Sequence, residues 1–300
     1  MEDSILSAVG SPLVRIPGPT GSTVAAKVEA ANPGGSVKVR PAITMIRAAE
    51  SRDDLTAGDR IVEATSGNTG IGLSLVAAVE DYNITIVLPE STSEERQTIL
   101  EAYGADVVRV SGGMNRATER AEGIAEETGG YLVSQFENSA NPGAHYATTG
   151  EELLEQVEDR TIDAFVAPVG TGGTITGTAK RLRESFPDLL VAGVEPAANP
   201  FLSTGTPSEH DFQGMGPDFI PQVLDRDVID RVESVSLDRA EEECRTLART
   251  EGLLVGQSSG AAAVAARRVA SDLLEEHTDP LVVTIFPDSG ERYLSVGVFD

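Results

Sequence analysis

The sequence predicts an α/β fold with parallel sheets covered by helices and organised in two domains. Short runs rich in β-branched residues alternate with longer segments in which apolar residues recur at helical spacing, a pattern typical of parallel sheets. Two glycine-bearing loops follow strands of this pattern, at the ends where open α/β sheets bind ligands. A chain of 300 residues with 40% hydrophobic content is also long enough to build two packed cores.

The predicted elements follow this alternation along the chain. The strands are Arg60 to Glu63, Asn83 to Leu88, Asp106 to Val110, Tyr131 to Val133, Ile162 to Ala167, Val191 to Val194 and Leu281 to Phe286. The helices are Thr69 to Val79, Ser93 to Tyr103, Met114 to Glu127, Gly173 to Ser185, Leu237 to Thr250 and Ser259 to Glu276, several with Ser or Thr caps.

A domain junction is predicted between Ser139 and Thr149. That stretch is short of apolar residues and precedes a very acidic helix, Glu151 to Asp159. Neither low-complexity tracts nor internal repeats occur elsewhere in the chain.

Charge and cysteine content exclude several classes of protein. A formal net charge of −25 predicts an acidic surface that repels nucleic acid and anionic membranes. The acidic residues are spread along the whole chain, as expected of a protein adapted to high salt. Cys244, the single cysteine, rules out an intramolecular disulfide and a cysteine-held metal, and helical spacing predicts that it is buried. The run Ile71 to Val79 is too short to span a bilayer. Because the chain has a single cysteine, we expect a cytoplasmic protein that binds no metal.

Lys38 is a candidate covalent catalyst because of where it lies. It is one of only three lysines, and it follows the turn sequence Asn32-Pro33-Gly34-Gly35. Ser36 is a good N-cap residue, and a lysine just inside a helix N-terminus lies against the macrodipole, which disfavours its charged form. A neutral amine attacks carbonyls, so this environment suits a Schiff-base lysine that carries pyridoxal phosphate. An ordinary solvated lysine fits this segment equally well.

The first glycine-bearing loop, Thr65 to Gly70, follows the strand Ile61 to Glu63 and opens a helix near Thr69. Its hydroxyls, its amide and the helix-terminal N–H groups can hold a carboxylate. Taken alone, the loop is more typical of a polar strand-to-helix turn with routine capping.

The second loop, Gly170-Thr171-Gly172-Gly173-Thr174, lies between a strand and a helix, and its backbone amides form a cradle suited to phosphate. Its spacing matches neither a P-loop nor a dinucleotide-binding fingerprint, which favours a smaller phosphate-bearing cofactor. Near the C-terminus, Ser289 follows another strand and could face a heteroaromatic nitrogen. Together with Lys38 these groups meet the requirements of a pyridoxal phosphate site.

The chain resembles the cysteine synthase (O-acetylserine sulfhydrylase) and cystathionine β-synthase family of pyridoxal phosphate enzymes nearly from end to end. The matching motifs are Asn32 to Arg40, Thr65 to Gly70, Gln135-Phe136 with Asn141-Pro142, Gly170 to Thr174, Gln213 to Gly216, Gly256 to Gly260 and Pro287 to Leu294. The resemblance implies a fold-type II enzyme with two open twisted sheets, helices on both faces of each sheet, and the cofactor in the interdomain cleft. It implies a smaller mobile domain over 35–142, carrying the lysine and carboxylate loop, and a larger one over 1–34 and 143–300, carrying the phosphate loop.

The resemblance also implies a role for each matching residue. Lys38 would bond covalently to pyridoxal 5'-phosphate, Asn68 would contact its ring hydroxyl and Ser289 its pyridine nitrogen. Its phosphate would be held by Gly170, Thr171, Gly172, Gly173 and Thr174. The substrate carboxylate would be bound by Thr65, Ser66, Thr69 and Gln135, and closure of the smaller domain would exclude water.

The implied activity is that of a cysteine synthase, a transferase that converts O-acetyl-L-serine and sulfide to L-cysteine and acetate. Two alternatives stay open, a cystathionine β-synthase-like enzyme and one that uses O-phosphoserine, since Asp218 to Arg226 looks closer to the cystathionine β-synthase branch. The loop Gly205 to Gly216 holds His210 but no Arg or Lys for a phosphate, which favours O-acetylserine. Val39 stands where many members carry Asp, and we expect no loss of chemistry from it.

Two functions from other classes have weaker support in the sequence. A catalytically silent sensor would have lost the lysine or a loop, and neither is lost. Dehydration of a hydroxyamino acid needs the same site without a thiol. The resemblance further implies a homodimer, and leaves a complex with a serine acetyltransferase open.

Overall fold

The computed structural model describes residues 2–300, which form two compact α/β units. The first unit comprises residues up to Val9 and Asn32–Asn141, and the second comprises Gly10–Ala31 and Pro142–Asp300. The chain therefore passes between the units three times. Residues before Val9 belong to the first unit, whereas the domain division inferred from the sequence grouped them with the larger domain.

The first unit is built on a four-stranded, fully parallel sheet in the order β5-β4-β3-β6. Its strands are β3 (Arg60–Ala64), β4 (Asn83–Pro89), β5 (Asp106–Val110) and β6 (Tyr131–Leu132). Its helices are η1 (Ile5–Ala8), η3 (Pro33–Gly35), α1 (Val39–Ser51), α2 (Asn68–Glu80), α3 (Glu94–Ala102) and α4 (Met114–Thr128).

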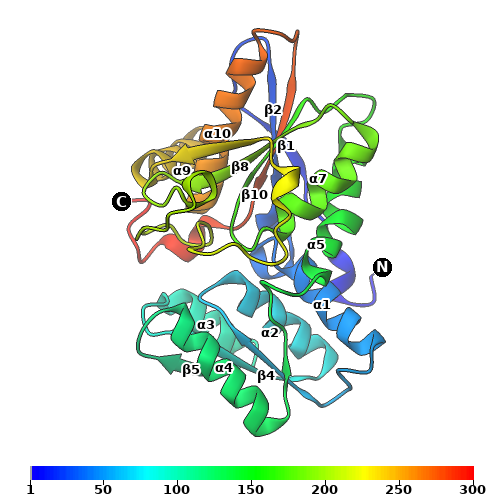
Figure 1. The fold of residues 1–300 in the computed structure, drawn as a ribbon, viewed down its shortest axis with the longest axis vertical. Helices are drawn as coiled ribbons and strands as arrows, with labels where there is room; N and C mark the ends of the chain where they lie inside the picture. Colours follow the sequence, from blue (N-terminus) through cyan, green and yellow to red (C-terminus); the bar gives the residue numbers. More distant parts are fainter. Residues whose placement is uncertain (1) are drawn as a thin grey trace. The chain divides into compact units, whose positions relative to one another are not determined.

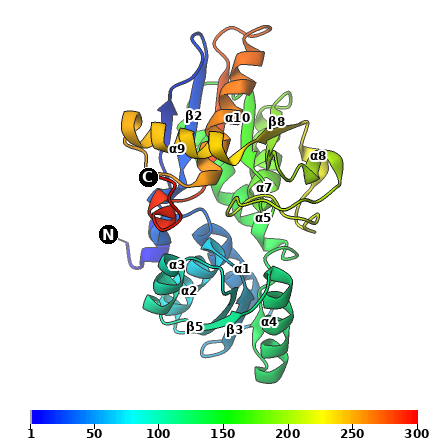
Figure 2. The same cartoon turned by 90° about the vertical axis from the view of Figure 1, so that its left-hand side faces the viewer.

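Both faces of this sheet are buried, which explains its nearly continuous apolar strands. Ile61 and Ile86 belong to a core shared with α1 and α2, whereas Val62 and Val87 belong to a core shared with α4. Figure 2 shows α1 and α2 on one side of this sheet and α4 on the other.

The second unit is built on a six-stranded sheet in the order β1-β2-β10-β7-β8-β9, in which only the edge pair β1 and β2 is antiparallel. Its strands are β1 (Leu13–Ile16), β2 (Thr23–Val28), β7 (Ala164–Pro168), β8 (Leu190–Pro196), β9 (Arg231–Val235) and β10 (Leu281–Phe286). Its helices are η2 (Glu29–Ala31), η4 (His145–Gly150), α6 (Glu151–Gln156), α7 (Gly173–Ser185), α8 (Phe201–Thr204), η5 (Arg226–Val228), α9 (Leu237–Glu251), α10 (Gln257–Leu273) and η6 (Gly290–Tyr293), while α5 (Ala140–Ala144) spans the last passage between the units.

Alternate residues of each central strand again enter different cores. Ala164 and Val166 pack with α10, while Phe165 and Ala167 pack with α7. Figure 1 shows α10, in orange, and α7, in green, within this unit. The predicted fold of two open sheets with helices on both faces is confirmed.

The elements predicted from the sequence are all present, with ends that differ by a few residues. The sequence reading missed β1, β2 and β9, and the acidic helix α6 ends at Gln156 instead of Asp159. Within residues 2–300, every helix is too short or too polar to cross a membrane.

Each sheet has one switch point, where the strand order reverses and α/β sheets bind ligands. In the first unit the chain runs from β3 outward to β5 and returns to place β6 on the other side of β3. In the second unit it runs from β7 outward to β9 and returns to place β10 beside β7. The segments after β3, β6, β7 and β10 are therefore the places to look for a site.

Candidate functional site

Lys38 immediately precedes α1 and is its N-cap residue, with its carbonyl accepting from the N–H of Ala42 at 3.0 Å. The sequence reading placed the cap at Ser36, and this was wrong, although the Ser36 hydroxyl does accept from the Lys38 N–H at 3.3 Å. Burial lowers the pKa of the Lys38 amine to about 8. The neutral amine is therefore easier to form than in a solvated lysine, and the cause is burial, not the helix macrodipole on which the sequence argument relied.

Gly72 on α2 allows this arrangement. A Cβ built on Gly72 would lie 2.8 Å from the Lys38 carbonyl oxygen, closer than side chains approach backbone. Helix α2 can therefore pack against the backbone of Lys38 only because position 72 has no side chain.

The loop after β3 presents two buried hydroxyls and one exposed hydroxyl. Thr65 and Thr69 are buried, whereas Ser66 is exposed. The Thr65 hydroxyl accepts from the Gly67 N–H at 3.2 Å, and Asn68 is the first residue of α2. The first turn of a helix presents N–H groups at its N-terminus, which suits such a loop for an anion, and here the Gly70 N–H donates to the Gly67 carbonyl at 3.1 Å.

Gln135 follows β6 and meets this loop within the first unit. The Thr69 hydroxyl donates to Gln135 Oε1 at 2.5 Å, and Asn141 Nδ2 donates to the Gln135 carbonyl at 2.9 Å. The structure thus brings together, at the switch point between β3 and β6, two residues that the sequence assigned to one carboxylate site.

The loop Gly170–Thr174 follows β7 and leads into α7 at the switch point of the second unit. Gly172 has φ +84°, a left-handed conformation that favours glycine, and a Cβ there would lie 2.6 Å from Leu224 Cβ. A Cβ on Gly170 would lie 2.6 Å from the Gly214 carbonyl oxygen. Neighbouring segments therefore pack directly on the loop backbone, just before the first turn of α7, where the Gly173 N–H donates to the Thr171 hydroxyl at 3.4 Å.

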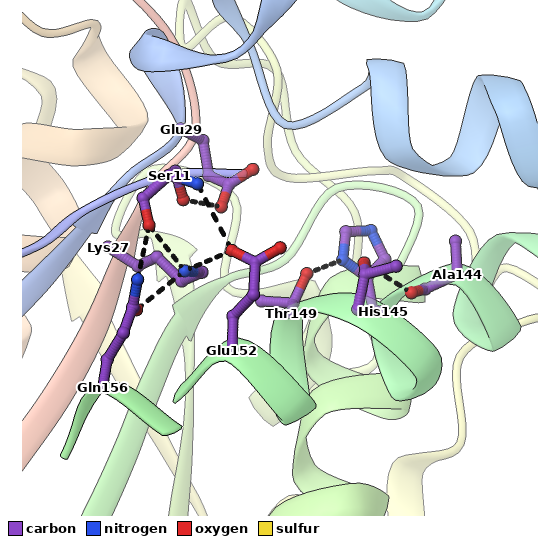
Figure 3. Close-up of polar contacts among 9 residues, drawn as sticks. Ser11, Lys27, Glu29, Ala144, His145, Thr149, Glu152 and Gln156 are labelled. Atoms are coloured by element: carbon purple, nitrogen blue, oxygen red, sulfur yellow. Dashed lines mark hydrogen bonds and ion pairs between the residues drawn. The ribbon is translucent and has the colours of Figure 1, made fainter. Parts of the chain in front are cut away.

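His145 is a site residue that the sequence reading missed. Its Nε2 lies 3.3 Å from the hydroxyl of Thr174 in this loop. Its Nδ1 lies 2.9 Å from the hydroxyl of Thr149, the contact drawn in Figure 3. It lies in η4, a π-helical segment of the kind often found at functional sites. Gly177 permits close packing there, since a Cβ at 177 would lie 2.0 Å from the Pro142 carbonyl oxygen. The sequence carries no signal for this contact, because it does not give the distance in space between His145 and the loop.

Ser289 follows β10, the neighbour of β7, and is half-buried. Its hydroxyl donates to Glu291 Oε2 at 3.2 Å and caps η6. Its segment is held against the start of α10, where the Gly256 N–H donates to the Asp288 carbonyl at 3.2 Å. The structure therefore places Ser289 at the same switch point as the glycine loop.

Three further residues bear on the site, of which only His210 and Cys244 were considered in the sequence. Both ring nitrogens of His210 bond within its own loop, to the Gly216 carbonyl at 2.7 Å and the Phe212 N–H at 3.1 Å. Cys244 is fully buried, as predicted, and burial raises its pKa to about 12. Arg96 was missed: its Nη1 lies 3.5 Å from the Ser66 carbonyl, so an arginine does reach the loop after β3.

Comparisons with known proteins cover essentially the whole chain. The family model described as pyridoxal-phosphate dependent enzyme matches residues 6–288. A cysteine synthase of Staphylococcus aureus is 45% identical over 303 residues, covering 99% of this chain and 97% of the relative. The structure of an O-ureido-L-serine synthase is 39% identical with a TM-score of 0.96, covering 100% of this chain and 96% of that one. The O-acetylserine-dependent cystathionine beta-synthase of Helicobacter pylori is 38% identical with a TM-score of 0.93, covering 100% of this chain and 99% of that one.

Proposed function

Because the chain belongs to the family of pyridoxal-phosphate dependent enzymes, we propose that it is a cysteine synthase, converting O-acetyl-L-serine and sulfide to L-cysteine and acetate. The observation that carries this proposal is the buried Lys38 amine with its pKa lowered to about 8, in a chain 45% identical to a cysteine synthase over its full length. In the reaction the bond from Cβ to the acetate oxygen breaks and a bond from Cβ to sulfur forms.

The residues of the second unit's switch point fit the phosphate of pyridoxal 5'-phosphate. The glycine loop and the first turn of α7 offer backbone N–H groups that would hold a phosphate, with Thr171 and Thr174 adding hydroxyls. Asn68 would contact the ring hydroxyl and Ser289 the ring nitrogen. When bound, the cofactor withdraws electrons from the α-carbon of the amino acid, which eases loss of the α-proton and of the β-substituent.

Lys38 would bond to the cofactor and then act as the base. Its amine, freed when the amino acid binds, would take the α-proton as acetate leaves and return it after sulfur has added to Cβ. A lysine with a pKa near 8 is suited to both steps, since its neutral and charged forms are close in free energy near neutral pH.

The substrate carboxylate would bind in the first unit. Thr65, Ser66 and Thr69 offer hydroxyls and N–H groups after β3, and Gln135 offers its amide after β6. The hydrogen bond between Thr69 and Gln135 joins the two halves of this site.

A second candidate function is the same kind of replacement with another thiol as acceptor or another amino acid as donor. The similarity to an O-acetylserine-dependent cystathionine beta-synthase favours a larger thiol as an alternative to sulfide. Arg96, which reaches the Ser66 carbonyl, is a cation that could serve O-phosphoserine in place of O-acetylserine.

The proposal extends to the setting of the enzyme. We propose a cytoplasmic homodimer adapted to high salt, with 35–142 as the smaller domain, and a serine acetyltransferase as a possible partner. The net charge of −25 supports the salt adaptation, because self-repulsion of an acidic surface is relieved by salt.

A product assay tests the activity. The purified protein, loaded with pyridoxal phosphate in buffer of high salt concentration, is given O-acetylserine, O-phosphoserine or serine, each with sulfide or homocysteine. Fastest turnover with O-acetylserine and sulfide supports the proposal. Turnover only with homocysteine or only with O-phosphoserine selects the corresponding alternative. Release of a keto acid and ammonia without any thiol would identify a dehydratase instead.

A further inference from the structure

Glu63 is a carboxylate on an apolar face of a buried strand. It is the fourth residue of β3 and is 3% exposed. Side chains alternate along a strand, so Glu63 shares its face with Ile61, whose core is formed with α1 and α2. A carboxylate in such a position costs free energy unless hydrogen bonds compensate it, and so its partners indicate why it is there.

The partners of Glu63 are all on the segment that carries Gln135. Glu63 Oε2 accepts from the Ser134 N–H at 2.9 Å, and Oε1 accepts from the Gln135 N–H at 3.5 Å. The Gln135 side-chain amide also favours the ionised form of this carboxylate, although burial raises its pKa overall. Glu63 therefore binds the backbone N–H of one residue of the proposed carboxylate site and that of the residue before it.

The Glu63 carboxylate accepts hydrogen bonds from the two residues that follow the last bond between β3 and β6. Strands β3 and β6 pair in parallel up to the bond from the Val133 N–H to the Val62 carbonyl, at 3.1 Å. Ser134 then turns with φ 55°, a left-handed conformation uncommon outside glycine, and the next two N–H groups point to Glu63. The side chain of Glu63 thus replaces the backbone acceptors that a continued strand would have supplied.

Gln135 is held at both its backbone and its side chain. Glu63 accepts from its N–H, Asn141 donates to its carbonyl, and Thr69 donates to its Oε1. A glutamine amide also carries two donor protons on its nitrogen. Because these bonds fix the amide, its N–H groups have a fixed direction in which to meet a substrate carboxylate.

We propose that Glu63 is a positioning residue for the amino-acid substrate: its carboxylate fixes Ser134 and Gln135 so that Gln135 presents its side-chain N–H donors, together with the backbone N–H of Thr69, to the substrate carboxylate. This inference rests on the carboxylate-binding role proposed above for Gln135 and Thr69. It assigns to Glu63 an effect on substrate binding without any contact with substrate.

The test is the substitution Glu63→Gln in the full-length, cofactor-loaded protein, assayed at pH 8, where wild-type Glu63 with its pKa of about 7 is ionised. It keeps the shape of the side chain but replaces one acceptor oxygen by an NH2 group, which cannot accept from a backbone N–H. We expect the KM for O-acetylserine to rise about tenfold, the effect of one lost hydrogen bond, while kcat and the KM for sulfide change little. We also expect faster hydrogen–deuterium exchange at the Ser134 and Gln135 amides, which reports the geometry independently of activity.

The matched control is Glu233→Gln. Glu233 is a buried carboxylate on the edge strand β9, paired with Arg231 at 2.6 Å, and it takes no part in the proposed site. Its variant should keep the wild-type KM for O-acetylserine. If Glu63→Gln does not fold, Glu63→Asp, which keeps the carboxylate one methylene short, serves instead and should raise the same KM with kcat retained.

The outcomes separate this inference from the proposed function. Wild-type protein that makes no cysteine from any donor would refute the proposed function, whereas the amide exchange of the variant would still report on Glu63. Wild-type protein that makes cysteine, with a Glu63→Gln variant unchanged in KM and in amide exchange, would overturn the inference. A fall in kcat without a rise in KM would also overturn it, since a positioning residue for the carboxylate acts on binding.

Discussion

Thr69 and Gln135 are joined by a hydrogen bond of 2.5 Å between Oγ1 and Oε1, although 66 residues separate them in the sequence. Thr69 lies on the first turn of α2 and Gln135 follows β6. The bond exists because β6 returns to the side of β3 after the chain has passed through β4 and β5. The proposed carboxylate site is therefore a product of sheet topology more than of local sequence.

Replacing Thr69 with Val should weaken substrate binding with little effect on folding. The change keeps the shape but removes the hydroxyl that orients Gln135, so we expect the KM for O-acetylserine to rise about tenfold. The control is Ser74→Ala on the same helix, because the Ser74 hydroxyl is buried without a hydrogen-bond partner among the described residues. Steady-state kinetics should show a normal KM for the Ser74 variant. An equal KM in both variants would argue against the role of Thr69.

Replacing Gly72 with Ala should disturb Lys38 directly. The new Cβ would lie 2.8 Å from the Lys38 carbonyl oxygen, and overpacking of this kind costs about 2 kcal/mol of stability. We expect a lower free energy of unfolding in urea and a reduced content of bound cofactor. In the control Gly123→Ala on α4, the nearest atom is Arg120 Nη1 at 3.7 Å, and a gain of about 0.5–1 kcal/mol is expected. Full cofactor content in the Gly72 variant would contradict the account.

Removal and return of the cofactor should reveal the lowered pKa of Lys38. Only the neutral amine attacks an aldehyde, and its fraction grows about tenfold with each pH unit below the pKa. With a pKa of about 8, the rate at which apo-protein takes up pyridoxal phosphate should rise with pH and level off above 8. The rise of the cofactor's visible absorption in stopped flow measures it. A rate that still climbs at pH 10 would indicate an ordinary lysine.

Glu63 should make the stability of the protein depend on pH. Burial raises its pKa from 4.5 to about 7 in the folded protein, which therefore holds a proton that the unfolded chain releases above pH 4.5. Raising the pH through this window should lower the free energy of unfolding of the wild type by up to about 3 kcal/mol relative to Glu63→Gln. Urea unfolding at pH 5 to 8 measures the difference. A difference that stays constant with pH would contradict the raised pKa.

Lys27 should contribute strongly to the stability of the second unit. Its ammonium is fully buried and contacts the Ser11 carbonyl at 2.9 Å, Gln156 Oε1 at 2.9 Å and Glu152 Oε2 at 2.7 Å (Figure 3). Lys27→Met would leave a partly buried carboxylate without its cation, which costs about 3 kcal/mol. The control Lys180→Met breaks a pair with Asp225 in which the lysine is half-exposed, and should cost less than about 1 kcal/mol. Equal unfolding free energies for the two variants would refute this.

Most of the fold and half of the site follow from local patterns in the sequence. The strand and helix that flank Gly170–Thr174 were predicted because a buried parallel strand is continuously apolar and its following loop is glycine-rich. Strands β1, β2 and β9 were missed because each mixes charged residues into its apolar run. Strands β1 and β9 lie at the edges of the sheet, and β2 forms the antiparallel pair with β1.

The remaining parts of the site depend on contacts between distant residues. The role of Glu63 is invisible in the run Arg60 to Ala64, since nothing local shows that β6 ends against it. The contact of His145 with Thr174 depends on a π-helical segment and on the missing side chain of Gly177. Such positions conflict with local rules, and conflicts of this kind tend to mark functional sites.

The measurement that tests the central claim most directly is the rate of cysteine formation from O-acetylserine and sulfide by the wild type, Lys38→Ala and Lys180→Ala. The chain has three lysines, so the comparison isolates one of them. Our account predicts that the wild type and the Lys180 variant each release one acetate for every cysteine formed. The Lys38 variant should not turn over. Near-normal turnover by the Lys38 variant would contradict it.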